Sequence, residues 1–205
     1  LLQPCAMKIL KISPGQVDSR HIAEAAATIR DGGVVIFPTD TLYALGCDAL
    51  NHRAIERMCR IKGIEPDSRP LSLLCADLSQ ASDYARIDNG AFRVLRHYLP
   101  GPFTFLLPSA LRLPKAFKGR KTIGLRVPDN DIARALAAET GSPLLCTSVR
   151  LDDPEELEEP DSIAMHYATA AEVLIDGGHG GTVPSTIVDL TDSSAPETVR
   201  EGAVP

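Results

Sequence analysis

The sequence predicts an α/β fold, in which helices pack on a twisted, open, mixed sheet. Helical and strand patterns alternate along all 205 residues, as they do in sheets covered by helices. The hydrophobic content of 44% is sufficient for one full core, and no Pro/Gly/Ser-rich linker divides the chain. Between residues 103 and 127 two strand patterns follow each other without a helix, which favours a mixed sheet over a purely parallel one.

The first third of the chain predicts strand, helix, strand and helix in that order. Residues 7–12 alternate between apolar and polar side chains, as an amphipathic strand does. Asp18 or Ser19 can cap a helix that runs to about residue 30 and ends at a Gly-Gly pair. The apolar run 34–37 suits a buried strand. Asn51 can cap the next helix, which continues to about residue 62.

The rest of the chain continues this alternation. Apolar runs predict strands, and polar caps before a helical period predict helices. The segment Pro100-Gly101-Pro102 ends the helix before it sharply. The further predicted strands cover residues 71–75, 103–107, 122–127, 144–147, 173–175, 186–190 and 198–200. The further predicted helices cover residues 77–84, 88–98, 129–139 and 162–169.

The domain prediction is a single domain over residues 7–202. Residues 1–6 precede the first strand pattern and are interpreted as an N-terminal extension. No apolar run reaches the roughly 18 residues that a membrane helix needs, and the N-terminus lacks a secretory signal. The five scattered cysteines suit a reducing compartment. We therefore expect a cytoplasmic protein that does not associate with membranes.

Charge and residue spacing argue against several function classes. A net charge of -6 does not favour binding to nucleic acid through total charge. Neither the cysteines nor the five histidines have the spacing of a metal-ligand set, so no protein metal site is predicted. A G-x-S-x-G motif is absent, which argues against a hydrolase with a nucleophile elbow.

Polar side chains follow the predicted strand 34–37 directly. Thr39, Asp40, Thr41 and Tyr43 lie where open α/β sheets bind ligands, beyond the carboxyl end of a strand. Hydroxyl groups both donate and accept hydrogen bonds, so they suit a small polar substrate. An ordinary turn, with Asp40 bonded to its own backbone, explains the same residues equally well.

Three other segments carry candidate ligand groups. Thr147, Ser148 and Arg150 end a strand and could hold a phosphate or carboxylate, although a polar strand end is the simpler explanation. Arg126 interrupts an apolar strand, so it either pairs with an acid or faces a ligand. The glycine-rich segment 177–181 could bring backbone amides close to phosphate, or form a plain turn.

Several short motifs occur along the chain in one order. They are FPTDTLYALG at 37–46, RPLSLL at 69–74, PGPFTF at 100–105, IGLRVP at 123–128, TS at 147–148, PSTIVD at 184–189 and REG at 200–202. Together they resemble the YrdC/YciO-like family, whose better-known members are L-threonylcarbamoyladenylate synthases. The resemblance extends over about residues 7–202 and implies a YrdC-like fold.

The resemblance also implies a reaction. Threonine, bicarbonate and ATP with Mg²⁺ would give threonylcarbamoyl-AMP and pyrophosphate, and this product would feed the modification of an adenosine in tRNA. The implied class is therefore a nucleotidyltransferase. Members of the family have also been regarded as binders of double-stranded RNA. The alternative is accordingly a YciO-type protein that binds double-stranded RNA or a nucleotide without that activity.

The same resemblance assigns roles to single residues. The implied substrate-binding residues are Thr39, Thr41, Tyr43, Thr147 and Ser148. The implied catalytic residues are Lys62, Arg69 and Arg126. The implied nucleotide-binding residues are Arg150, Ser185 and Arg200.

Two motifs depart from the synthase pattern. Lys62-Gly63-Ile64 lacks the arginine of a K-x-R signature, and Ser148-Val149-Arg150 carries arginine in place of the asparagine of S-x-N. An arginine cannot accept a hydrogen bond as the amide oxygen of asparagine does. Both departures resemble the YciO branch, and one hypothesis is that Arg150 replaces the lost arginine beside Lys62 in space.

Overall fold

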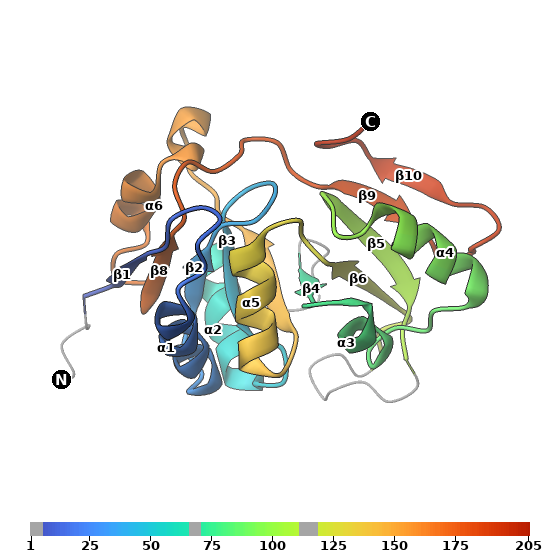
Figure 1. Cartoon of the computed structure of the whole chain (residues 1–205), viewed down its shortest axis with the longest axis horizontal. Helices are drawn as coiled ribbons and strands as arrows, with labels where there is room; N and C mark the ends of the chain where they lie inside the picture. Colours follow the sequence, from blue (N-terminus) through green and yellow to red (C-terminus); the bar gives the residue numbers. More distant parts are fainter. Residues whose placement is uncertain (1–5, 66–70, 111–118) are drawn as a thin grey trace.

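In the described part of the chain, one ten-stranded sheet carries helices on both faces (Figure 1). The structure, a computed structural model, describes residues 6–65, 71–110 and 119–205. The strands lie in the order β1-β8-β2-β3-β7-β4-β6-β5-β9-β10, with parallel and antiparallel pairs in the same sheet. The predicted α/β fold with a mixed sheet is therefore confirmed.

Strands from distant parts of the sequence become neighbours in this sheet. β1, β8 and β2 pair in parallel, as do β4 with β6 and β5 with β9, whereas the other pairs are antiparallel. The strands are β1 (Lys8–Lys11), β2 (Val35–Phe37), β3 (Ala44–Asp48), β4 (Ser72–Leu74), β5 (Phe103–Pro108), β6 (Thr122–Arg126), β7 (Leu144–Ser148), β8 (Val173–Asp176), β9 (Thr186–Asp189) and β10 (Glu197–Arg200).

The helices begin at polar caps. The Asp18 carboxylate accepts from the backbone of Arg20 at 2.9 Å, so Asp18 is the cap that starts the first helix. Asn51 and Asn130 cap two later helices through their side-chain oxygens. The helices are α1 (Ser19–Arg30), α2 (His52–Lys62), α3 (Leu78–Ser82), α4 (Asn89–Tyr98), α5 (Asp131–Thr140), the 3-10 helix η2 (Pro154–Glu158) and α6 (Pro160–His166).

The hydrophobic core has two layers, one on each face of the sheet. On one face, α1 and α5 pack side by side over β1, β8, β2, β3 and β7 (Figure 1). On the other face, α2, α3, α4 and α6 contribute the buried side chains. Since α1 and α5 cover only one half of their face, the other half stays free for a cavity.

Strand β3 is absent from the elements predicted by sequence. Its residues, Ala44–Asp48, include Ala, Gly and Asp, which have low strand propensity. The strand is nevertheless central, because β2 and β7 pair with it on both sides. Gly46 is required there, since a Cβ atom would lie 2.6 Å from the ring of Phe37. The 3-10 helix η2 was not predicted either.

Candidate functional site

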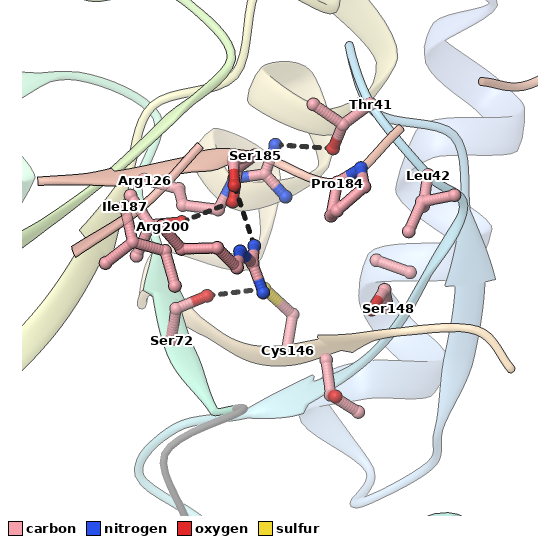
Figure 2. A pocket seen from close by; sticks show the side chains of 13 residues that line it. Thr41, Leu42, Ser72, Arg126, Cys146, Ser148, Pro184, Ser185, Ile187 and Arg200 are labelled. Carbon is pink, nitrogen blue, oxygen red and sulfur yellow. Dashed lines mark hydrogen bonds between the residues drawn. The ribbon is translucent and has the colours of Figure 1, made fainter. Parts of the chain in front are cut away.

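A cavity of about 240 Å³ lies on the part of the sheet face that α1 and α5 leave open. Its walls come from the strands β3, β7, β4, β6, β5 and β9, from the segments before β3 and β9, and from β10. Figure 2 shows how the labelled side chains surround it. The lining residues are Thr41, Leu42, Ala44, Ser72, Thr104, Arg126, Cys146, Thr147, Ser148, Pro184, Ser185, Ile187 and Arg200.

The strand register explains why residues far apart in the sequence meet here. Ser72 lies opposite Cys146 in the ladder of β4 and β7, and Thr104 lies opposite Ile187 in the ladder of β5 and β9. Paired residues in a sheet point to the same face. Strand pairing therefore brings Ser72, Cys146, Thr104 and Ile187 to the same side of the sheet, where they line the cavity.

Arg126 is the most buried cation of the site. Its side chain and that of Asp40 are each 9% exposed, and Nη2 donates to Asp40 Oδ1 at 2.9 Å. The other carboxylate oxygen of Asp40 accepts from the backbone N–H of Asp129 at 2.8 Å. A buried arginine is stable only when it is paired in this way. Asp40 thus fixes the guanidinium at the end of β6.

Two threonines join Arg126 to the loop before β3. The Thr39 hydroxyl donates to the carbonyl of Leu42 at 2.7 Å. Its hydrogen is therefore used, and in the 3.1 Å hydrogen bond between the two hydroxyls Thr41 is the donor and Thr39 the acceptor. The oxygen of Thr41 then accepts from Arg126 Nη2 at 3.0 Å. Thr39 does not line the cavity, but it orients Thr41, which does.

Two buried polar atoms beside the cavity have no hydrogen-bond partner among the described residues. They are Arg126 Nε and Thr147 Oγ1. Both residues line the cavity, and both are at least nine-tenths buried. Leaving such atoms unpaired costs roughly 1–3 kcal/mol each. Arg126 pairs with Leu74 and points to the cavity side of the sheet, so a polar ligand there can complete the hydrogen bonds of its Nε. Thr147 pairs with Leu45, and its hydroxyl points to the other face.

The opposite wall carries Ser185 and Arg200. The Ser185 hydroxyl shares a hydrogen bond of 2.8 Å with that of Thr104, and Arg200 Nη2 donates to the Ser185 carbonyl at 2.7 Å (Figure 2). Partial burial, followed by the charge of Arg126, lowers the pKa of Arg200. Among the described residues Arg200 makes no salt bridge with a carboxylate, so the cavity carries an uncompensated positive charge suited to anions.

Tyr43 points away from the cavity. Its hydroxyl donates to the carbonyl of Gly178 at 2.7 Å and accepts from the N–H of Gly177 at 3.1 Å. Burial raises the pKa of Tyr43 to about 12. The phenol therefore braces the glycine-rich segment.

The glycine-rich segment 177–181 packs against the loop 39–43. Gly180 N–H donates to the carbonyl of Glu158, and Gly181 N–H donates to that of Thr41, each at 2.9 Å. The amides of Gly177 and Gly178 are also bonded, to Tyr43 and to the Asp176 side chain. The hypothesis that these amides hold phosphate is wrong, because four of the five are already bonded within the protein.

Lys62 lies behind one wall of the cavity, at the end of α2. Its ammonium donates to the backbone carbonyl of Ser148, whose residue lines the cavity. Burial, and then the nearby charge of Arg150, lower the pKa of Lys62 to about 8. The two cations are thus close enough to interact, but neither lines the cavity and the side chain of Arg150 is exposed.

The structure brings six of the expected site residues together around the cavity. These are Thr41, Arg126, Thr147, Ser148, Ser185 and Arg200. Four others, Thr39, Tyr43, Lys62 and Arg150, lie beside it without lining it. Arg69 lies outside the described residues.

Sequence reasoning assigned no role to Asp40 as the partner of Arg126, nor to Ser72, Thr104 and Cys146. Ser72 and Thr104 are single polar residues in apolar strands, which is a detectable signal. Cys146 entered the sequence analysis only as one of five scattered cysteines. Its Sγ is 3.6 Å from Ser72 Oγ, and burial raises the pKa of its thiol.

Carboxylates are scarce around the cavity. Asp40 is occupied by Arg126 and Asp129, and the described residues contain no cluster of three His, Cys, Asp or Glu that could hold a metal ion. Mg²⁺ in nucleotide enzymes is commonly held by substrate phosphates and water with few protein ligands. This donor set fits Mg²⁺ that arrives with a nucleotide. No helix in the described parts of the chain has the length and apolar character needed to cross a membrane.

Comparison with known proteins gives one consistent family. The Sua5/YciO/YrdC family, described as "Telomere recombination", matches residues 27–202. The protein YciO of Escherichia coli K12, which is uncharacterized, is 42% identical over 194 residues, covering 93% of each chain. The crystal structure of E. coli YciO superposes with a TM-score of 0.87 over 97% of both chains.

Some longer relatives are named as enzymes. The threonylcarbamoyl-AMP synthase of Bacillus subtilis is 33% identical over 189 residues, which cover 90% of this chain and 54% of that protein. The crystal structure of Sua5 from Pyrococcus abyssi complexed with L-threonine is 30% identical, with a TM-score of 0.83. The match covers 96% of this chain and 58% of that one.

Proposed function

Since the chain belongs to the Sua5/YciO/YrdC family, we propose that it forms threonylcarbamoyl-AMP from threonine, bicarbonate and ATP in the cavity. The observation that carries this proposal is the buried, unpartnered Nε of Arg126 on the cavity side of the sheet. This atom marks the place where a small polar molecule supplies the missing hydrogen bond. The threonine complex of the Sua5 relative supports threonine as that molecule.

Size and charge support an amino acid at the Arg126 end. A volume of about 240 Å³ is just below the range of roughly 300–1,000 Å³ that holds drug-sized ligands. One carboxylate can accept from the free Nε of Arg126 in a charge-assisted hydrogen bond. Ser148, which lines the same cavity, then has a hydroxyl to offer to a second polar group of the same molecule.

The nucleotide belongs at the Arg200 end of the proposed site. Arg200 is exposed at the edge of the sheet, and its guanidinium is anchored only to the Ser185 carbonyl among the described residues. It can therefore meet the phosphates of a molecule that extends out of the cavity. Mg²⁺ would enter with those phosphates and neutralise part of their charge.

The proposed chemistry needs positioning rather than a protein nucleophile. The threonine amine and bicarbonate give a carbamate with loss of water. A carbamate oxygen then bonds to the α-phosphorus of ATP, and the bond from that phosphorus to the pyrophosphate oxygen breaks. Negative charge develops on the α-phosphate oxygens, and Arg200 lies where it can stabilise that charge.

Threonine binding tests the Arg126 end by itself. We expect wild-type protein to bind L-threonine in calorimetric titration, and Arg126→Gln to weaken binding by at least about 50-fold, through loss of a charged hydrogen bond. Arg134→Gln is the matched control, because Arg134 pairs with Asp131 on α5 and does not line the cavity.

Two results would contradict the proposal. One is folded wild-type protein that does not bind threonine. The other is an Arg126→Gln variant that binds it as tightly as the Arg134→Gln control.

A further inference from the structure

We infer that Thr186 is a positioning residue, whose hydroxyl holds Arg200 at the cavity by fastening the chain that follows β10. Thr186 is 1% exposed and does not line the cavity itself. The identity of the ligand rests on the proposed function, whereas the placement of Arg200 rests on contacts within the chain.

A β-bulge sets the direction of the Arg200 side chain. β10 and β9 pair regularly until the register shifts between Thr198 and Arg200, so Val199 is an extra residue and Arg200 lies opposite Ile187. Without the bulge, Val199 would lie opposite Ile187 and Arg200 opposite Thr186. Because paired residues share a face and Ile187 lines the cavity, the bulge brings the arginine to the cavity side.

The bulged strand needs another anchor, since all four residues of β10 are exposed. The Thr186 hydroxyl provides it. Its oxygen accepts from the N–H groups of Gly202 at 3.1 Å and Val204 at 3.2 Å, and it donates to the carbonyl of Val204. One donor and two acceptor positions use the full capacity of a hydroxyl. Thr186 therefore holds the chain two to four residues beyond Arg200.

The same segment packs directly on the cavity wall. A Cβ atom on Gly202 would lie 2.3 Å from the carbonyl oxygen of Pro184, and Ala203 N–H donates to that oxygen at 2.9 Å. Pro184 and Ser185 line the cavity, and Arg200 donates to Ser185 (Figure 2). Residues 200–204 thus pack against and hydrogen-bond to the start of β9, and Arg200 lies on the cavity side of this contact.

Two substitutions at Thr186 separate the hydroxyl from the side-chain shape. Thr186→Val keeps the shape and removes all three hydrogen bonds, whereas Thr186→Ser keeps the hydroxyl. We expect Thr186→Val to speed amide hydrogen exchange of residues 198–204 by about tenfold or more, as measured by mass spectrometry. Thr186→Ser is expected to exchange nearly as the wild type does. Normal exchange in Thr186→Val would overturn the inference.

The link to Arg200 is tested with MgATP as the probe. We expect Thr186→Val to weaken MgATP binding by roughly tenfold and Arg200→Ala by at least as much. The double variant should bind no more weakly than Arg200→Ala alone, because Thr186 acts through Arg200. Penalties that simply add would show a general structural effect and overturn the inference.

Different results would contradict the proposed activity and the positioning role of Thr186. Wild-type protein that binds no MgATP contradicts the proposed function. In that case crystal structures still decide the positioning role. Loss of the contact from Arg200 to Ser185 in Thr186→Val, and its retention in Thr186→Ser, support the role. Retention of the contact in both variants overturns it.

Discussion

Arg126 and Asp40 form an ion pair that is almost wholly removed from solvent, and this pair carries the anion-binding end of the cavity. Replacing Asp40 by Asn keeps the shape but leaves the guanidinium without its counter-charge. Breaking one side of a buried pair is costly. We therefore predict that Asp40→Asn lowers the free energy of unfolding by about 3 kcal/mol in urea titrations.

The control for this prediction is Asp129→Asn. The Asp129 side chain is 72% exposed, and its carboxylate reaches Arg134 only at 3.4 Å. Surface pairs of this kind contribute little, so a change below about 0.5 kcal/mol is expected. Equal stabilities of the two variants would show that the Asp40 pair does not hold the site.

Lys62 gives the site a pH-dependent contribution to stability. The pKa of its amine is lowered to about 8 in the folded protein, mainly by burial and then by Arg150. Because the unfolded chain holds the proton up to a higher pH, the cost of burying the charge is fully present below pH 8 and disappears as pH rises further. We predict that wild-type protein gains stability relative to Lys62→Gln between pH 8 and pH 10, in paired urea titrations. A difference that stays constant over this range would contradict the assignment.

At the scale of elements, the loop before β3 and the glycine-rich segment support each other. A Cβ atom on Gly181 would lie 2.5 Å from the carbonyl oxygen of Thr41. Gly181→Ala is predicted to push the Thr41 loop away from Arg126, at a cost of about 2 kcal/mol in stability. Threonine affinity should fall with it.

Gly124→Ala serves as the control in the same region. The nearest contact of a Cβ atom at this position is 3.4 Å, to the methyl group of Thr104. Stability and threonine affinity should therefore change little. If both alanine variants behave alike, contact with Thr41 is not what fixes the loop.

The elements also show what the sequence could predict. Apolar residues at helical spacing, together with the caps Asp18 and Asn51, correctly predicted the two helices that follow them. Apolar runs predicted most of the strands. The sequence did not predict β3, because its residues have little strand propensity and its stability comes from pairing with β2 and β7 on either side. Motif order pointed to six residues of the cavity, but pairing partners such as Asp40 with Arg126 depend on tertiary contacts between residues 86 positions apart.

For the whole molecule, the distribution of charge matters more than its sum. Residues 152–161 contain seven carboxylates and no basic residue, so the rest of the chain carries a net charge of +1. This acidic segment contacts the glycine-rich segment, which in turn contacts Thr41 at the cavity. It therefore lies where it disfavours approach of an anionic nucleotide.

We predict that Glu155→Gln combined with Glu156→Gln tightens MgATP binding about twofold at low salt, with little effect at 0.5 M salt. Both residues are exposed, so folding should be preserved. Glu139→Gln, on α5, is the control for a general charge effect. The same tightening in this control, or a salt-independent effect, would refute a local role of the acidic segment.

The proposed activity is tested most directly by synthesis of threonylcarbamoyl-AMP. Protein is incubated with ATP, Mg²⁺, L-threonine and ¹³C-labelled bicarbonate, and the products are identified by mass spectrometry. We expect threonylcarbamoyl-AMP with one ¹³C atom, pyrophosphate in equal amount, and loss of both in Arg126→Gln. Folded wild-type protein that yields no labelled product above the enzyme-free reaction would contradict the proposed activity.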